Sequence, residues 1–184
     1  MQILAVSGSL QDRSANSALV RAAQRMLPAG MELVVHPSLG AVPLLNPELD
    51  GDTAPEPVRE LRAAFQAADG VLIASPEYGH SMPGLLKNAL DWLVGSGELA
   101  NMPVALVSAS TTSGGGIRAQ IALIQTLLAQ AADVVVTLTV PGVKTKLDAQ
   151  NEIADPAILR RLGETLVALG EAADERRPRR PPSR

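Results

Sequence analysis

The chain has 184 residues, enough for one domain and too few for two of ordinary size. Hydrophobic residues make up 46% of it and charged residues 19%, and no apolar stretch approaches the roughly 20 residues that span a bilayer. The absence of cysteine excludes disulfides, thiolate catalysis and Cys-ligated metals, and the two histidines are too few for a zinc site. The first residues, MQILAVSGS, lack the basic region of a signal peptide. We therefore expect a cytoplasmic protein with no metal and no membrane partner.

The formal charge of −3 conceals a basic carboxyl-terminal segment. Residues 174–184 carry five Arg against two acidic residues, so this segment is +3 and the remainder −6. Three prolines oppose a helix there, and no apolar residue anchors the segment. We predict one domain over residues 1–173 and a disordered Pro/Arg-rich tail over 174–184. A basic tail can bind nucleic acid, but the acidic body lacks stacking aromatic side chains, so we expect no nucleic-acid partner.

Short apolar runs alternate with segments of helical spacing. The run over 70–75 is apolar almost throughout, as expected for a strand covered on both faces. The predicted strands are 3–6, 31–36, 70–75, 103–108 and 133–137. The predicted helices are 14–27, 57–69, 83–94, 115–131 and 156–173. The Pro-rich connection over 37–57 is too long for an idle loop, and we expect it at the rim of a site.

This alternation predicts a parallel sheet with right-handed crossovers. Two arrangements compete, a flavodoxin-like strand order 2-1-3-4-5 and half of a Rossmann fold. Neither G-x-G-x-x-G nor G-x-x-x-x-G-K-[ST] follows the first strand, which favours the first arrangement. We predict an α/β fold, a flavodoxin-like three-layer sandwich with a five-stranded parallel sheet of order 2-1-3-4-5 and helices on both faces.

In that order the first and third strands flank the crevice at the carboxyl edge of the sheet, and the fourth strand is their neighbour. The loops after these strands are the chain's richest in polar residues and glycine. They read SGSLQDRSAN over 7–16, SPEYGHSMPG over 75–84 and SASTTSGGG over 108–116. We therefore expect these three loops to form one site.

The first loop suits a phosphate. It offers the hydroxyls of Ser9 and Ser14, the amide of Asn16, the guanidinium of Arg13 and a helix amino terminus with unpaired N–H donors. The competing interpretation makes Ser14 an N-cap and Ser9 a turn residue, and the residues alone leave both open. The missing P-loop lysine argues against a nucleoside triphosphatase.

The second loop suits an aromatic ring system lying against backbone amides. Pro76 and Pro83 stiffen it, Gly79 permits close backbone approach, and Tyr78 adds a flat apolar face. The third loop can cover the edge of such a ring with main-chain donors, or it can be a flexible glycine connection; both interpretations stay open.

For several conspicuous side chains near these loops, the sequence favours a structural role over a functional one. Trp92 falls on the apolar stripe of its helix, which indicates packing or a subunit contact. Lys87 and Asp91 are spaced i and i+4, so they can pair in solvent. Neither Glu77 nor His80 has a partner in the sequence that would make it a convincing acid–base catalyst.

Two motifs together resemble the NADPH-dependent FMN reductase family of flavodoxin-like proteins, which includes chromate and quinone reductases. They are GSLQDRSANSAL after the first strand and SPEYGHSMPGLLKNALDWL after the third. The second is the more specific, and the similarity extends over about residues 1–170. The resemblance implies an FMN cofactor, NADPH or NADH as co-substrate, and a homodimer or homotetramer.

By this resemblance the first loop holds the FMN phosphate, the second lines the isoalloxazine ring largely through backbone groups, and the third lies near the ring. The implied FMN-binding residues are Ser9, Gln11, Arg13, Ser14, Asn16, Pro76, Glu77, Tyr78, Gly79, His80, Ser110, Ser113 and Gly115. Two positions depart from the family pattern. Gln11 stands where the family often has Arg, so Arg13 has to supply the cation, and Gly79 stands where Asn is common.

The resemblance further implies a ping-pong reaction. Hydride passes from NAD(P)H through FMN to a small acceptor: a quinone, free flavin, chromate or an azo compound. Such chemistry is carried by the cofactor and requires no catalytic side chain. The alternatives are a flavodoxin-like electron carrier and a non-catalytic flavin-binding scaffold.

Overall fold

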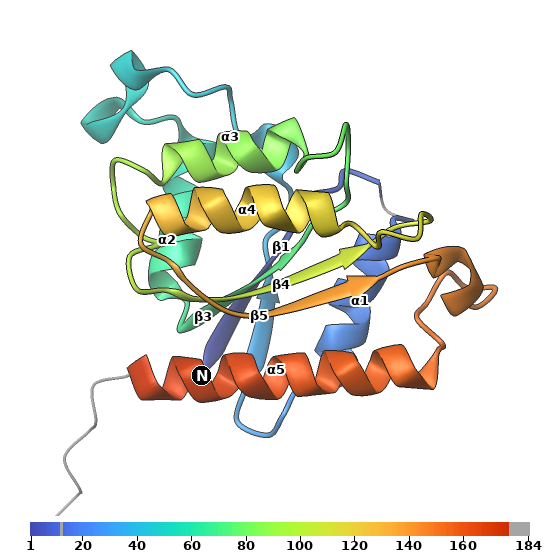
Figure 1. Ribbon diagram of the computed structural model, residues 1–184. Helices are drawn as coiled ribbons and strands as arrows, with labels where there is room; N and C mark the ends of the chain where they lie inside the picture. Colours follow the sequence, from blue (N-terminus) through green and yellow to red (C-terminus); the bar gives the residue numbers. More distant parts are fainter. Residues whose placement is uncertain (12, 177–184) are drawn as a thin grey trace, which may run out of the picture.

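The computed structural model describes residues 1–11 and 13–176, and within them one parallel sheet forms the centre of the molecule (Figure 1). Its strands lie in the order β2-β1-β3-β4-β5, which confirms the predicted order. They are β1 (Gln2–Ser7), β2 (Glu32–Val35), β3 (Gly70–Ala74), β4 (Pro103–Ala109) and β5 (Asp133–Val140). All four pairings are parallel, so every strand ends at the same edge of the sheet.

Helices cover both faces of this sheet, as predicted. Within the described residues the α-helices are α1 (Ala15–Arg25), α2 (Glu56–Ala67), α3 (Gly84–Trp92), α4 (Ile117–Ala129) and α5 (Pro156–Arg176). Helices α1 and α5 share one hydrophobic core with one face of the sheet, and α2, α3 and α4 share a second core with the other face. Figure 1 shows these as the two outer layers of a sandwich.

The central strands are apolar because both of their faces are covered. Every residue of β3 and of β4 is buried, whereas β2 and β5 at the two edges are partly exposed. Trp92 is fully buried, and its indole Nε1 donates a hydrogen bond to the carbonyl of Pro43 at 2.8 Å. Of the two predicted roles for Trp92, packing is therefore confirmed, and a subunit contact by this fully buried side chain is excluded.

Most boundaries differ from the sequence prediction by one or two residues, and two differ by three. Strand β5 continues to Val140, and α5 continues to Arg176 instead of ending at 173. The first proline of the predicted tail is Pro178, so nothing in residues 174–176 opposes a helix. The rest of that tail, 177–184, lies outside the described residues.

The connection between β2 and α2 contains three short 3₁₀ helices, η1 (Leu39–Ala41), η2 (Pro47–Leu49) and η3 (Gly51–Thr53). Its middle part runs along α3, where the Asn88 amide donates to the Pro43 carbonyl and accepts from the Leu45 backbone N–H. Figure 1 shows the part after η1 projecting away from the body of the molecule. Only the beginning of the connection therefore lies near the first loop.

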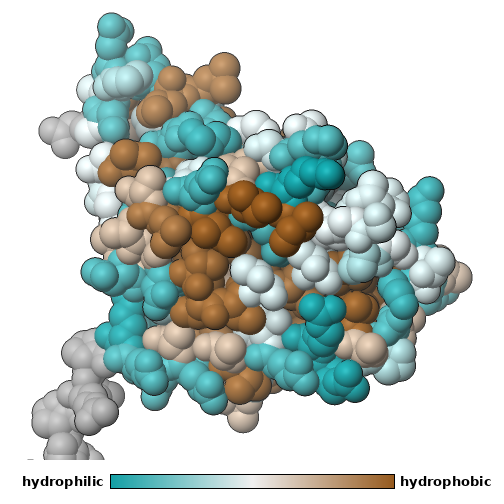
Figure 2. Space-filling model, viewed as in Figure 1, coloured by the Kyte–Doolittle hydropathy of each residue, from teal (hydrophilic) through white to brown (hydrophobic). Residues whose placement is uncertain are grey.

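The outer surface of α4 is unusually apolar. Ile117, Ile121 and Leu128 are 45%, 51% and 60% exposed. Figure 2, in the same view as Figure 1, shows hydrophobic surface over the middle of the molecule, where α4 and β5 lie. Among the described helices, none is long and apolar enough to cross a membrane.

Candidate functional site

The three polar loops lie at the carboxyl edge of the sheet, and contacts made by residues in or next to them join each pair. The backbone N–H of Gly8 in the first loop donates to the carbonyl of Ala74, directly before the second loop, at 2.8 Å. The amide of Asn16 pairs with Ala109 at the start of the third loop. Glu77 in the second loop reaches Arg118 at the beginning of α4. These contacts therefore bring the three predicted loops into one region of the molecule.

The first loop presents polar groups at the amino terminus of α1. Ser14 is the N-cap of α1, and its hydroxyl accepts a hydrogen bond from the Asn16 N–H at 3.1 Å. The Ser9 hydroxyl accepts from the Gln11 N–H at 3.2 Å. The side chains of Gln11 and Arg13 are exposed. The capping interpretation of Ser14 is thus correct, and Ser9, Gln11 and Arg13 remain accessible to a ligand.

Asn16 has a different role from a simple phosphate ligand. Its Nδ2 donates to the Ala109 carbonyl at 3.1 Å, and its Oδ1 accepts from the Ala109 N–H at 2.9 Å. The side chain is buried, so both ends of the amide are used inside the protein. Asn16 therefore fixes α1 to the end of β4.

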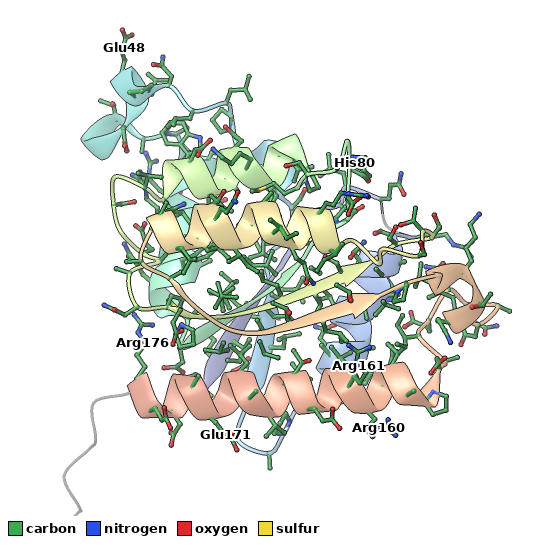
Figure 3. All side chains as sticks on the ribbon, viewed as in Figure 1. Glu48, His80, Arg160, Arg161, Glu171 and Arg176 are labelled. Atoms are coloured by element: carbon green, nitrogen blue, oxygen red, sulfur yellow. The ribbon has the colours of Figure 1, made fainter. Side chains whose placement is uncertain are left out.

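The second loop closes as a tight turn over Tyr78–Ser81. The two end residues exchange backbone hydrogen bonds, each of 3.0 Å. Gly79 and His80 at the centre both have positive φ, 56° and 63°, the pattern of a type I′ turn. A glycine adopts this conformation without strain, whereas a histidine there is uncommon. The turn places Tyr78, 52% exposed, and His80 (labelled in Figure 3) at the surface.

The turn leaves backbone donors available. Within the described part of the chain, the N–H groups of Glu77, Gly79 and His80 donate to no protein acceptor. Pro76 is buried before them, and its carbonyl accepts from the Ser75 hydroxyl at 3.0 Å. The predicted surface of backbone donors beside an aromatic side chain is therefore present in the structure.

Glu77 does not direct its carboxylate toward that open surface. Its Oε2 accepts from the Arg118 backbone N–H at 3.1 Å, and its Oε1 lies 3.5 Å from the Arg118 guanidinium. The side chain is only 11% exposed. Glu77 thus serves as the cap of α4, which a carboxylate suits because a helix amino terminus is electropositive.

The third loop is folded back on itself. The hydroxyls of Ser110 and Thr112 are 3.0 Å apart, and the Thr112 N–H donates to the Ser110 oxygen. Ser113 is exposed. Gly115 is buried at φ 61°, where a Cβ would stand 2.9 Å from the Pro141 nitrogen. Close packing therefore requires glycine at position 115.

A cavity borders the first loop on the side of β2. Its lining includes Ser9 and Gln11 together with His36 and Ser38. Burial lowers the pKa of His36, although the nearby Glu60 raises it. This cavity does not lie between the first and second loops, and among the predicted residues it shares only Ser9 and Gln11.

Sequence reasoning missed Arg118. A basic residue in the first turn of a helix opposes the macrodipole, so the pattern Gly-Gly-Gly-Ile-Arg at a helix start indicates an acidic partner nearby. That signal could have linked Arg118 to Glu77. Among the described residues, no three His, Asp or Glu side chains form a group that could hold a metal ion.

Comparisons with known proteins agree on one family. The family model for NADPH-dependent FMN reductases matches residues 1–144. A quinone reductase of Escherichia coli (strain K12) is 35% identical over 177 residues, which cover 93% of this chain and 94% of that protein. An NAD(P)H-dependent FMN reductase of Pseudomonas aeruginosa is 38% identical over 130 residues, 70% of each chain. The solved structure of FerB, a flavoenzyme NAD(P)H:acceptor oxidoreductase from Paracoccus denitrificans, superposes with a TM-score of 0.79 at 25% identity, covering 95% of this chain and 97% of that one.

Proposed function

The chain belongs to the NADPH-dependent FMN reductase family, and from this membership we propose that its three-loop site passes reducing equivalents from NAD(P)H to a quinone or a similar small acceptor. The protein is an oxidoreductase with FMN as its cofactor and NAD(P)H as its reductant. When bound, FMN would supply the redox chemistry that links NAD(P)H to the acceptor. The observation that carries the site assignment is the Tyr78–Ser81 turn, with its unpaired backbone donors, at the same edge of the sheet as the amino terminus of α1.

The donor set of the first loop fits a phosphate. It combines the Ser9 hydroxyl, the exposed Gln11 amide and Arg13 guanidinium, and the positive end of α1. Arg13 supplies the full positive charge. We propose that Ser14 and Asn16 hold the loop in shape, Ser14 through its cap and Asn16 through Ala109.

The second loop fits a flat heteroaromatic ring. The free N–H groups of Glu77, Gly79 and His80 can donate to ring carbonyls and nitrogens, and Tyr78 offers an apolar surface next to them. Ser110 and Ser113 of the third loop border the same region. We propose no catalytic side chain, because Glu77 is held by α4 and His80 lies at the exposed corner of the turn.

A ping-pong order follows if NAD(P)H and the acceptor use the same open surface in alternation. The turn over Tyr78–Ser81 provides one such surface. The acceptors we propose are quinones first, with free flavin, chromate and azo compounds as further substrates of the same exposed site. The cytoplasmic location stays a prediction from the cysteine-free composition.

An absorbance titration with FMN tests the cofactor site, followed by assays of NADPH and NADH oxidation with menadione and with free FMN. We expect saturable flavin binding and oxidation of NAD(P)H in both assays. Parallel lines in double-reciprocal plots of initial velocity at several acceptor concentrations would support the ping-pong order. Bound FMN without NAD(P)H oxidation would instead indicate an electron carrier, and absence of FMN binding would leave a non-catalytic scaffold.

Arg13→Ala sharpens the site assignment. Losing the cation should raise the Kd for FMN by about tenfold and leave the Kd for riboflavin unchanged, because riboflavin has no phosphate. Arg160→Ala, on the exposed surface of α5, is the matched control and should change neither value. Equal affinities of the Arg13 variant and the unmodified protein for FMN would exclude Arg13 from the phosphate site.

We also propose that the chain assembles as a homodimer or homotetramer through the outer surface of α4. Ile117, Ile121, Ile124 and Leu128 follow one another at intervals of 4, 3 and 4 residues, the spacing of a helix–helix seam. Arg118 is the sole charged residue of α4. A second copy offers the same uncharged stripe, so two α4 helices can pack across a two-fold axis without burying unpaired charge.

A further inference from the structure

We propose that Glu77 is a positioning residue: its carboxylate anchors the Tyr78–Ser81 turn to the amino terminus of α4 and so sets where the turn's backbone donors stand. The inference rests on the proposed function, because those donors are the groups assigned to the FMN ring. It gives a partly buried acidic side chain of the second loop a task other than acid–base chemistry.

The geometry of the contact between Glu77 and Arg118 suits a positioning role. The Glu77 carboxylate meets the Arg118 backbone N–H at 3.1 Å and the Arg118 guanidinium at 3.5 Å. Glu77 is 11% exposed, whereas Arg118 is 56% exposed. The Glu77 carboxylate is therefore largely covered, whereas the Arg118 guanidinium faces water, where an ion pair contributes little. The main attachment is to the helix terminus itself.

Helix α4 depends on this cap. The helix has no side-chain N-cap of its own and no acidic residue in its first turn, and its N-cap position is Gly116. Four N–H groups at a helix start need acceptors from outside the helix. Glu77 supplies one of these acceptors from a different loop, so the helix and the turn share a single carboxylate.

The amino terminus of α4 is also a fixed point. Gly116 has φ 90°, and a Cβ there would stand 2.7 Å from the Ser108 Cβ. A Cβ on Gly115 would stand 2.9 Å from the Pro141 nitrogen. The backbone at the start of α4 is thus pressed against the ends of β4 and β5. A side chain bonded to this backbone is therefore held in a fixed position relative to the edge of the sheet.

The turn itself has few other restraints. Within the described chain, no side chain from Tyr78 to Ser81 makes a hydrogen bond or ion pair with the rest of the protein, and the turn's own hydrogen bonds join its two ends only to each other. Glu77 immediately precedes it. Without the carboxylate contact, the turn would keep its internal shape but lose its polar connection to the sheet edge.

The experiment measures the Kd of FMN and of riboflavin for the apoprotein by flavin fluorescence quenching, together with the thermal midpoint of each variant. The central variant is Glu77→Ala, and Glu77→Gln keeps an oxygen that accepts from the Arg118 N–H. Asp155→Ala is the matched control. Asp155 also caps a helix, accepting from the N–H groups of Ala157 and Ile158 at the start of α5, and also pairs with a cation, Lys146.

We expect Glu77→Ala to raise the Kd of both flavins by about tenfold, because the lost contact positions the ring and not the phosphate. Glu77→Gln should recover most of that loss, to within about threefold of the unmodified protein. Arg118→Ala should have less effect than Glu77→Ala, since it removes the exposed ion pair and keeps the backbone donor. Asp155→Ala should lower the thermal midpoint but leave both Kd values within about twofold.

The inference would be overturned if Glu77→Ala lowered the thermal midpoint as Asp155→Ala does while binding FMN as tightly as the unmodified protein. Glu77 would then be a helix cap alone. A Glu77→Gln variant with affinity as poor as that of Glu77→Ala would also contradict it. If the unmodified protein bound no flavin, the proposed function would fail first, so the two failures are distinguishable.

Discussion

Helices α4 and α5 cover opposite faces of the same sheet, yet their outer surfaces differ in kind. The outer surface of α5 carries Arg160, Arg161, Glu164, Glu171, Asp174 and Glu175, and Figure 3 shows Arg160 and Glu171 directed away from the sheet. The outer surface of α4 presents Ile117, Ile121 and Leu128 and a single charge. One helix has the surface of a solvated layer, and the other has the apolar stripe of a helix that packs against a partner.

The amino termini of α4 and α5 also differ, because their caps come from different parts of the chain. Helix α5 is capped by Asp155, the residue directly before it. Helix α4 starts from the left-handed Gly116 and takes its cap from Glu77, which accepts from the N–H of Arg118, 41 residues later in the chain. Local sequence specifies the start of α5, whereas tertiary packing specifies the start of α4. Two helices of similar burial can therefore depend on different parts of the chain.

The largest effect should come from charging the α4 stripe. We expect Ile121→Glu to convert the proposed assembly into 19.2 kDa monomers, because the glutamate would be buried without a partner at the proposed contact. Sedimentation equilibrium measures the mass. Val167→Glu, at a similarly exposed aliphatic position on α5, should leave the mass unchanged. A monomeric unmodified protein, or a Val167 variant that dissociates as well, would remove the distinction between the two surfaces.

Replacing the N-cap glycine of α4 and a glycine inside α5 should change the free energy of unfolding in opposite directions. Gly116→Ala places a Cβ against Ser108 in a left-handed conformation and should lower the free energy of unfolding by about 2–4 kcal/mol. Gly163→Ala lies inside α5, where a Cβ would meet Met26 at an ordinary 3.5 Å, and should raise it by about 0.5–1 kcal/mol. Urea denaturation measures both. Two destabilised variants would show that α5 is as tightly constrained as the start of α4.

The segment that leads into α5 should contribute an acid-dependent stability. Burial raises the pKa of Glu152, but hydrogen bonds from Arg21 and Arg25 outweigh it, so the pKa lies below its ordinary value of 4.5. A lowered carboxyl pKa stabilises the fold above the unfolded value, and that stability is lost as the pH falls through the folded value. Glu152→Gln should flatten the decline of the urea midpoint below pH 4.5. Glu164→Gln, whose pair with Arg160 is fully solvated, should not.

The smallest effect should come from His36, at the β2 edge of the sheet. Its Nδ1 is buried and has no hydrogen-bond partner among residues 1–11 and 13–176, and burial lowers its pKa below 6.5. The protonated form therefore favours the unfolded chain, and stability should decrease as the pH falls from 6.5 through the folded pKa. His36→Gln should remove this part of the pH dependence, followed as the urea midpoint between pH 7 and pH 5.5. An unchanged slope would show that His36 ionises equally well in both states.

The sheet order and the meeting of three loops followed from the sequence because apolar runs mark the strands and parallel strands end at one edge. The pairing of Asn16 with Ala109 did not, since it joins residues 93 positions apart. The turn at Gly79 and His80 was also missed, because Tyr-Gly-His-Ser lacks the Asn-Gly pair that marks such turns. The capping role of Glu77 was not predicted either, because it depends on the fold placing the start of α4 beside the second loop.

The pairing of Asn16 with Ala109 makes one amide proton a reporter for a distant loop. The Ala109 N–H is bonded to a side chain at the start of α1, so its exchange with solvent requires α1 and the end of β4 to separate. A ligand that steadies the first loop should slow that exchange, although it touches no atom of β4. Occupancy at the amino terminus of α1 can thus be followed at a single backbone position in the middle of the chain.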